Sequence, residues 1–408
     1  MLVGFDVTAL HVAQGGVFTY DYSLLRALLE LDGQDDYVLL DYLPLRGRRP
    51  APPELAELAA RGGRIVRCRG VRHRRLARWK AAQAPLLQAP ARCIDRALSG
   101  PWSAAARWTM RRALSRALAG VDVFHSSDVL LWRQPDARNV VTIYDLTALL
   151  MPQFHTAETV ALQQRKFRFA REKADVVVAI SEITRRDVVT HLGILPDRVR
   201  VVYGGVDPAF CPIADREVLV QSLAPLGLVP GGYILYVGNV EPRKNLVCLV
   251  EAYDRARQTL PPPLPRLVLA GAATWKSAAV FARVEELGLQ DSVLFAGRVP
   301  GRMLPALYNG ALLFVYPSLY EGFGLPPLEA MACGVPVIAA NRGALPEVVG
   351  EAGLLFDAAD GEALTAAIVE TLGDARRRQA LGRAGLERAR SFTWQRAAAA
   401  MRAVYEGA

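Results

Sequence analysis

The chain has 408 residues, of which 52% are hydrophobic and 22% charged, with 33 glycines and 26 prolines. This is the composition of a globular protein, and it excludes a disordered, a collagen-like or a coiled-coil chain. The net charge is +9, and the length favours two domains over one, since domains average roughly 100–200 residues.

The positive charge is concentrated in residues 46–116. This segment carries 17 arginines and one lysine against three acidic residues, a net charge of +15, so the rest of the chain has a net charge of −6. Trp79, Trp102 and Trp108 lie among the arginines. Cations mixed with bulky apolar groups are typical of a segment that lies on an anionic bilayer, and a solvated arginine-rich surface fits the same composition.

The five cysteines are scattered and form no metal-binding pattern, which predicts a reduced protein without a zinc site. No uncharged run predicts a membrane-spanning helix, and the first residues lack the pattern of a signal peptide. We therefore expect a cytoplasmic protein. Peripheral attachment to the inner face of the plasma membrane through 46–116 is a further hypothesis.

Short β-branched or aromatic runs alternate with helix-length segments along the first half of the chain. Most are continuously apolar, as expected for parallel strands that helices cover on both faces. After an initial apolar run at 2–7, they are residues 37–41, 64–68, 122–125, 140–144, 175–180 and 199–203.

A turn-rich stretch at 203–208 interrupts this pattern and is the best candidate for an interdomain linker. A second series of runs follows at 233–237, 266–270, 292–296, 312–316, 335–339 and 354–356. The fold class predicted is α/β, with two doubly wound, Rossmann-like parallel sheets facing a central cleft.

The predicted domains are therefore an N-terminal, Rossmann-like domain at 1–205, with 46–116 as a basic insert, and a C-terminal, Rossmann-like domain at 206–380. A helical tail follows at 381–408. Ligands of such sheets bind beyond the carboxyl ends of the strands, so the cleft is the expected site.

One loop in the second series has the features of a phosphate site. Gly322 and Gly324 lie between a strand and a helix that opens on prolines, and backbone amides at such a helix start can bind an anion without a metal. Glu321 and Glu329 flank the loop. Carboxylates accept hydrogen bonds from sugar hydroxyls, which suggests a phosphorylated sugar. Alternatively, Glu329 only complements the helix dipole and Glu321 is solvated.

Cations that could neutralise a diphosphate follow another strand of the same series. Arg243 and Lys244 precede a helix-like run, which places them at the same carboxyl edge of the second sheet. A leaving diphosphate needs cations there. Taken alone, the two residues could equally be an ordinary exposed pair.

Residues 292–356 resemble the signature region of retaining GT-B glycosyltransferases of family 4, particularly the bacterial mannosyltransferase-like members that build surface polysaccharides. Glu321, seven intervening residues and Glu329 match the acidic motif of that family. Residues 175–182 and 201–207 also resemble family segments. The arginine-rich stretch before Arg116 resembles none that we can name.

The resemblance implies that the N-terminal domain at 1–205 binds the acceptor and the C-terminal domain at 206–380 binds the nucleotide sugar. It also implies roles for single residues. Glu329 matches the acid that binds the ribose hydroxyls, and Glu321 the acid at the sugar hydroxyls near the reacting centre. Arg243 and Lys244 fall where the family places diphosphate-binding cations. Val299 lies where backbone groups meet the nucleobase.

Two glycine-containing loops also resemble family loops. Gly15 and Gly16 follow the first strand and look like the loop that approaches the donor diphosphate when the cleft closes, although such a pair is common at strand-to-helix turns. The loop whose amides hold phosphate and sugar is matched by Gly322, Phe323, Gly324 and Leu325.

The chain departs from the family pattern at the end of the run 140–144. Many relatives carry histidine there, whereas this chain has Tyr144 followed by Asp145, which puts any role of that histidine in doubt. His125 and His155 are further candidates for the cleft, but a lone histidine is more often structural.

The resemblance implies transfer of a sugar from a nucleotide diphosphate to an acceptor hydroxyl with retention of configuration. The expected donor is GDP-mannose, with UDP-hexoses behind it, and the expected acceptor is a glycan or a lipid-linked precursor. The chain has no Asp-x-Asp, so no metal is expected, and no cofactor other than the nucleotide sugar as co-substrate.

Three alternatives remain at this stage. A phosphorylase or a sugar-nucleotide epimerase could use the same two-domain architecture. A nucleic-acid-binding protein could use the arginines of 46–116 for phosphates, but it leaves the two acids unexplained, and we expect no nucleic-acid partner.

Overall fold

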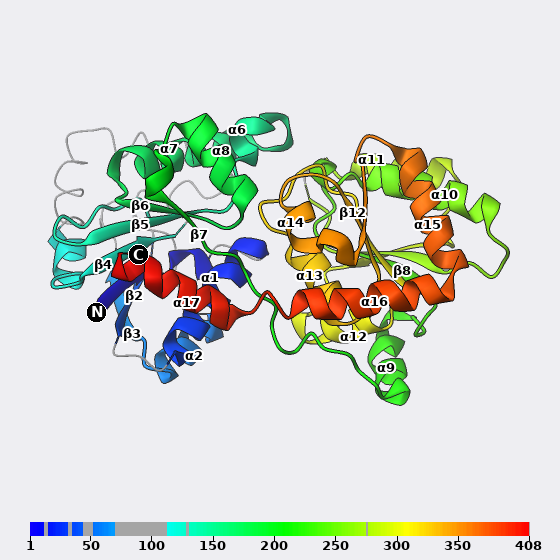
Figure 1. Ribbon diagram of the computed structural model, residues 1–408, viewed down its shortest axis with the longest axis horizontal. Helices are drawn as coiled ribbons and strands as arrows, with labels where there is room; N and C mark the ends of the chain where they lie inside the picture. The colour runs from blue at the N-terminus through cyan, green and yellow to red at the C-terminus, as the bar shows by residue number, and fades with distance from the viewer. Residues whose placement is uncertain are drawn as a thin grey trace, which may run out of the picture.

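The computed structural model describes residues 1–11, 15–31, 35–43, 52–69, 112–127, 130–274 and 276–407. These residues form two α/β domains side by side, each built on one sheet with helices on both faces (Figure 1). The strands of both sheets pair in parallel. The prediction of two doubly wound parallel sheets is confirmed, and each run predicted as a strand overlaps one.

The sheet of the N-terminal domain has the strand order β3-β2-β1-β4-β5-β6-β7. Side chains on both faces are buried, Val3, Phe5, Val141 and Val177 completely. The order reverses between β1 and β4, so the loops after these two strands separate at the carboxyl edge. The strands are β1 (Leu2–Asp6), β2 (Asp36–Leu43), β3 (Arg64–Arg69), β4 (Val123–Ser126), β5 (Arg138–Ile143), β6 (Val176–Ala179) and β7 (Val199–Val201).

The sheet of the C-terminal domain has the order β10-β9-β8-β11-β12-β13 and reverses between β8 and β11. Its strands bury apolar side chains, with Leu235, Leu269, Val315 and Ile338 completely buried. The strands are β8 (Tyr233–Val237), β9 (Arg266–Ala270), β10 (Val293–Gly297), β11 (Leu313–Tyr316), β12 (Val337–Ala340) and β13 (Leu354–Phe356).

Several helices begin at a polar residue whose side chain accepts a hydrogen bond from a backbone N–H group. Examples are Thr156, Ser181, Asp360 and Thr393. The helices of the N-terminal half are α1 (Gly16–Glu30), α2 (Pro53–Ala60), α6 (Thr147–Leu150), α7 (Ala157–Lys173) and α8 (Glu182–Leu192). Those that follow are α9 (Arg216–Leu223), α10 (Leu246–Thr259), α11 (Ala278–Glu286), α12 (Leu304–Asn309), α13 (Leu325–Ala332), α14 (Leu345–Val349), α15 (Gly361–Gly373), α16 (Ala375–Ala389) and α17 (Trp394–Glu406).

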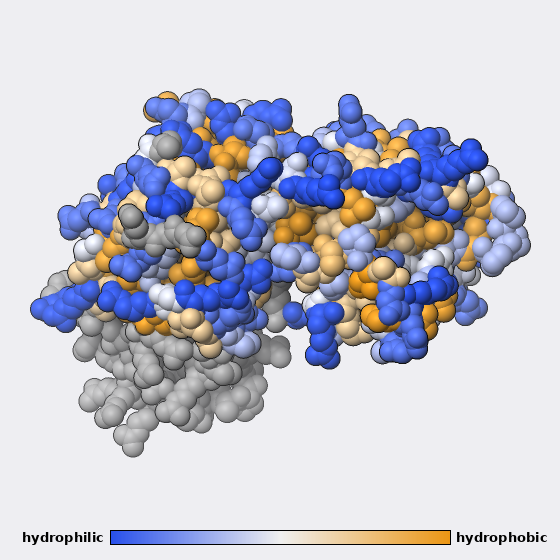
Figure 2. Space-filling model, turned by 60° about the horizontal axis from the view of Figure 1, so that its bottom comes forward, coloured by the Kyte–Doolittle hydropathy of each residue, from blue (hydrophilic) through white to orange (hydrophobic). Residues whose placement is uncertain are grey.

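The prediction that 46–116 is wholly an insert is wrong, because α2 and β3 belong to the N-terminal domain. β3 pairs with β2 from Val38 opposite Arg64 onwards and so extends the sheet. Residues 70–111, which hold the three tryptophans and many of the arginines, lie outside the described residues. In the described part of the chain, no helix has the length and apolarity of a bilayer span. The face in Figure 2 mixes hydrophilic and hydrophobic residues over both domains.

The predicted tail at 381–408 is not a single unit. Asp374 accepts hydrogen bonds from the backbone N–H groups of Arg376 and Arg377 at 2.8 and 3.0 Å, so α16 begins before residue 381. This helix packs on α13 of the C-terminal domain. The chain then crosses back, and α17 packs on α1 of the N-terminal domain (Figure 1). Gly205 lies in the first crossing, where an added Cβ would meet Trp394 N at 2.3 Å. Glycine there lets the two crossings touch.

His125 lies beneath α17 and not in the cleft, contrary to its candidacy as a site residue. Its Nδ1 is 2.7 Å from the Tyr405 hydroxyl, and its Nε2 is 2.7 Å from Thr142 Oγ1. Burial, together with the positive charge of Lys166, lowers the pKa of His125 to about 3. The ring is therefore neutral at physiological pH, and its hydrogen bonds attach α17 to β4 and β5.

Removing the Tyr405 hydroxyl tests this attachment. Tyr405→Phe leaves His125 Nδ1 buried without its partner, so we expect a loss of about 1–3 kcal/mol in the stability of the N-terminal domain. Urea unfolding followed by fluorescence measures it. Glu406→Gln, which alters only an exposed ion pair with Arg402, is the control and should cost less than about 1 kcal/mol. Equal stability of the two variants would contradict the assignment.

Candidate active site

The candidate site lies at the carboxyl ends of β8 and β11, where the order of the C-terminal sheet reverses. Such a reversal leaves a crevice in which doubly wound proteins bind ligands. The segment after β8 carries Arg243 and Lys244, and the segment after β11 carries Ser318 and Glu321. A hydrogen bond of 2.9 Å from the Leu319 N–H to the Arg243 carbonyl joins the two segments.

The Glu321 carboxylate is the centre of this cluster. Its Oε1 accepts hydrogen bonds from Lys244 Nζ and from Ser318 Oγ, both at 2.5 Å, and Arg243 Nη1 lies 3.2 Å away. Lys244 Nζ also donates to the Tyr316 hydroxyl at 3.0 Å. The side chains of Lys244 and Glu321 are only 9% and 12% exposed. Charge-assisted bonds of this length hold the carboxylate in one position.

The charges of the cluster keep Glu321 ionised. Burial favours the neutral acid, but the positive charges of Lys244 and Arg243 and the hydrogen bonds from Lys244 and Ser318 outweigh it and lower the pKa of Glu321 to about 2. Burial and the neighbouring Arg243 lower the pKa of Lys244. A carboxylate with so low a pKa accepts hydrogen bonds throughout the physiological range and is a poor general acid.

Arg243 connects the cluster to the cleft. Its guanidinium donates to the Tyr320 carbonyl at 2.6 Å and to Glu241 at 2.8 Å. Burial works against its charge, but the carboxylates of Glu321, Asp145 and Glu241 raise the pKa of Arg243 well above its ordinary value. The guanidinium is therefore a permanent cation beside the cleft. It lies close enough to Asp145 of the N-terminal domain to interact with that carboxylate electrostatically.

Glu329 has a different electrostatic environment from Glu321. It lies within α13, and its Oε2 accepts a hydrogen bond of 2.7 Å from the Tyr308 hydroxyl of α12. Burial raises the pKa of Glu329 to about 7; the bond from Tyr308 opposes the rise and the charge of Asp207 adds to it. The carboxyl is half protonated near neutral pH.

The loop between Glu321 and α13 offers its backbone, because its one aromatic side chain points elsewhere. The Phe323 ring packs against Tyr203 and Phe392, whose centroids are 6.2 and 5.8 Å away, in the two crossings between the domains. Gly324 precedes α13 with a φ of 117°, which favours glycine, and Leu325 is the first helical residue. Any ligand contact by Phe323 is therefore through its main chain.

The N-terminal domain forms the opposite wall of the site. An added Cβ on Gly322 would lie 2.0 Å from the Tyr144 carbonyl oxygen, so the two domains touch there. The Tyr144 hydroxyl donates to Asp21 at 2.5 Å, and Lys166 lies over its ring. These contacts make Tyr144 a fixed part of the wall.

A cavity of about 140 Å³ lies between this wall and Arg243. His155 borders it and is 2.9 Å from Thr147 Oγ1, which in turn donates to Asp145 at 2.6 Å. Burial and the charge of Arg243 lower the pKa of His155, against the opposing effect of Asp145. The structure thus brings Tyr144, Asp145, His155 and Arg243 to one cavity. The lining residues are Val17, Ile143, Tyr144, Asp145, Thr147, Ala148, His155, Thr159, Gln163, Lys166 and Arg243.

Gly15 and Gly16 lie at the start of α1, next to Val17 of this cavity, and both are exposed. Gly15 has a φ of 135°, which favours glycine, whereas an added Cβ on Gly16 would meet no described atom within 4 Å. Val299 follows β10, the edge strand two positions from β8, and is partly buried against the core.

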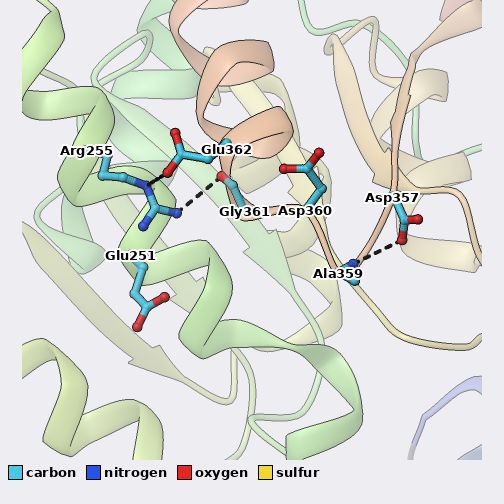
Figure 3. Close-up of a pocket in the computed structure, with 7 residues that line it drawn as sticks. All are labelled: Glu251, Arg255, Asp357, Ala359, Asp360, Gly361 and Glu362. Carbon is cyan, nitrogen blue, oxygen red and sulfur yellow. Dashed lines mark hydrogen bonds and ion pairs between the residues drawn. The ribbon is translucent and has the colours of Figure 1, made fainter.

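A larger, open hollow of about 490 Å³ lies elsewhere, on α10 and the segment before α15 (Figure 3). Its lining includes four carboxylates, those of Glu251, Asp357, Asp360 and Glu362. Its arginine, Arg255, is already bonded to the Gly361 carbonyl at 3.2 Å. Surplus negative charge repels a diphosphate, and α10 and α15 lie on the outer side of the domain, away from the cleft (Figure 1). The lining of this hollow is therefore poorly suited to a diphosphate.

Several residues of the site were not predicted from the sequence. Ser318 and Tyr316 lie within a few residues of Glu321, and polar groups at the end of an apolar strand and just after it were a usable signal. Tyr308 and Lys166 come from helices remote in sequence from the residues that they contact. No spacing pattern connects them to the site.

The architecture of the two domains and the site between them is that of the GT-B glycosyltransferases. HepE of Anabaena, in its crystal structure with UDP and glucose, has the same fold, with a TM-score of 0.71 over 100% of both chains at 16% identity. Residues 15–210 match the family described as Glycosyltransferase Family 4, and residues 229–388 match Glycosyl transferases group 1.

Relatives of known activity agree with this classification. The O-antigen chain mannosyltransferase B of Escherichia coli is 34% identical over 258 residues, which are 63% of this chain and 67% of the relative. The serotype-specific mannosyltransferase WbdA of Escherichia coli is 33% identical over 224 residues, 55% of this chain but only 28% of that longer protein. The chain belongs to the family 4 glycosyltransferases with the GT-B fold.

The raised pKa of Glu329 predicts pH-dependent nucleotide binding. If the ionised carboxyl accepts the ribose hydroxyls, it must lose its proton to bind, so affinity falls by up to tenfold for each pH unit below about 7. Calorimetry with GDP or UDP should give a dissociation constant about tenfold higher at pH 6 than at pH 8. Glu329→Gln should remove most of this dependence. The dependence that remains would come from ionisation of the nucleotide itself, which is the same for both proteins. Identical pH profiles of the dissociation constant in the wild type and in Glu329→Gln would contradict the role of Glu329 in binding the ribose.

Proposed function

We propose that this glycosyltransferase transfers mannose from GDP-mannose to an acceptor hydroxyl of a polysaccharide or lipid-linked precursor, with retention of configuration and without a metal ion. The observation that carries the proposal is the ionised Glu321, held by Lys244 and Arg243 where the C-terminal sheet reverses. The likeness to two Escherichia coli mannosyltransferases supports the choice of sugar. The bound UDP of HepE supports a nucleotide-sugar donor.

In the proposed reaction the bond between the anomeric carbon and the diphosphate breaks, and a bond to the acceptor oxygen forms on the same face. The acceptor proton passes to the departing phosphate oxygen. Arg243, Lys244 and the amides of residues 322–325 stabilise the charge that develops on the diphosphate, and Glu329 binds the ribose. Val299 would meet the nucleobase, and Gly15 and Gly16 would approach the diphosphate from the N-terminal domain.

Glu321 is better suited to orient the sugar than to attack it. Three donors already engage one of its oxygens, and its pKa of about 2 makes it a weak nucleophile. Front-face displacement is therefore our preferred mechanism over a covalent glycosyl intermediate on Glu321. Trapping such an intermediate would reverse this choice.

Product analysis tests the proposed function. With GDP-mannose as donor and methyl α-mannoside as probe acceptor, we expect a disaccharide whose new linkage has the anomeric configuration of the donor, as measured by NMR. The rate should be unchanged in EDTA. In thermal shift assays GDP should raise the unfolding midpoint more than UDP or ADP, because a ligand that binds only the native state stabilises it.

Other products would contradict this proposal in distinct ways. An inverted linkage would exclude retention, and activity lost in EDTA but restored by Mn²⁺ would exclude metal independence. With the acceptor omitted, sugar transfer to orthophosphate would indicate a phosphorylase, and an isomerised nucleotide sugar an epimerase.

We also propose that 46–116 brings the enzyme to an anionic membrane surface, where a lipid-linked acceptor would lie. The support is the net charge of +15 in that segment together with its three tryptophans. The protein should float with vesicles containing phosphatidylglycerol at low salt and be released by high salt. Vesicles of phosphatidylcholine alone are the control. Failure to bind the anionic vesicles at low salt would refute this part of the proposal.

A further inference from the structure

Glu347 joins the two domains by an interaction that the reaction described above does not use. It lies on α14 of the C-terminal domain. Its carboxylate accepts hydrogen bonds from the backbone N–H groups of Glu182 at 2.8 Å and Ile183 at 2.6 Å. These are the first two residues of α8 in the N-terminal domain. The Tyr203 hydroxyl donates to the same carboxylate at 3.2 Å.

The position of this carboxylate satisfies the start of α8. The first amides of a helix have no partner within the helix and carry the positive end of its dipole. Ser181 Oγ accepts the third amide, that of Thr184, at 3.1 Å, and Glu347 accepts the first two. A residue of one domain thus completes the N-terminal cap of a helix in the other.

Glu347 is also connected to Glu321 through a short piece of backbone. The Ala344 N–H donates to the Glu321 carbonyl at 2.9 Å. Gly343 has a φ of 56°, and an added Cβ there would lie 2.5 Å from the same carbonyl oxygen. The segment that begins α14 therefore rests directly on the main chain of Glu321.

The same helix α8 contacts the other side of the loop. Thr184 Oγ1 donates to the Gly322 carbonyl at 3.4 Å, and the Tyr320 hydroxyl donates to Asp187. The bonds from Glu347, Gly322 and Tyr320 to α8 hold the residues on both sides of Glu321 against the wall formed by Tyr144. Their partners belong to different domains, so these bonds depend on how the two domains are placed relative to each other.

We propose that Glu347 is a positioning residue. It holds the closed form of the enzyme and thereby fixes the position of Glu321 relative to the wall formed by Tyr144. In the open form its carboxylate and the amides of α8 would be hydrated. The role concerns domain closure and is independent of which donor or acceptor the enzyme uses.

The test compares Glu347→Gln and Glu347→Ala with Glu351→Gln, a control that changes an exposed acid four residues away. Loss of two charge-assisted hydrogen bonds should lower kcat by about 10- to 100-fold in the alanine variant and less in the glutamine variant. The KM for the donor should change less than about threefold, because most of the proposed diphosphate contacts come from the C-terminal domain. The control should retain full activity.

Closure itself is measured by small-angle scattering with GDP or UDP as the probe, which keeps this test valid if the proposed mannosyl donor is wrong. The wild type and Glu351→Gln should contract on nucleotide binding, and the Glu347 variants should contract less while their thermal midpoints stay within a few degrees. Unchanged kcat and contraction in the Glu347 variants would overturn the proposal. A fall in the midpoint of more than about 10 °C would do so as well, since it would indicate a purely structural role.

Discussion

The site depends on one buried electrostatic interaction, the contact of the Glu321 carboxylate with Lys244 and Arg243. The three charges lie in the segments after two neighbouring strands; the two cations keep Glu321 ionised, and Glu321 in turn favours the charged form of each cation. Removing one partner of such a buried group leaves an uncompensated charge, which costs about 3–5 kcal/mol. The interaction therefore fixes two loops together and at the same time leaves cations beside a cleft where a diphosphate can use them.

The rest of the molecule brings a second domain to this cluster. Two chain crossings touch at Gly205 and Trp394, and α17 is attached to the N-terminal domain through His125. The wall at Tyr144 meets the Gly322 backbone, and the Glu347 carboxylate joins α8 to the segment under Glu321. On the proposal made above, closure and assembly of the site are the same event, and closure would also limit the access of water to the donor.

Much of the fold could be predicted from the sequence, because buried parallel strands are continuous apolar runs and the breaks between them are rich in glycine and proline. The association of Glu321 with Arg243 and Lys244 was equally predictable, since the carboxyl ends of parallel strands share one edge of a sheet. What could not be predicted depends on contacts between distant segments. Periodicity does not reveal that α17 leaves its own domain, that His125 is buried beneath it, or that the partner of Glu347 is a helix end in the other domain. Within 46–116, net charge did not reveal that α2 belongs to the N-terminal domain, although the run at 64–68 predicted the strand β3.

A crystal structure of the protein with bound GDP tests the central claim most directly, because that claim places the donor diphosphate at the Glu321 cluster. The account predicts phosphate oxygens within hydrogen-bond distance of Arg243, Lys244 and the amides of residues 322–325, with the ribose hydroxyls on Glu329. A nucleotide bound in the hollow of Figure 3, or one whose phosphates contact neither cation, would contradict it.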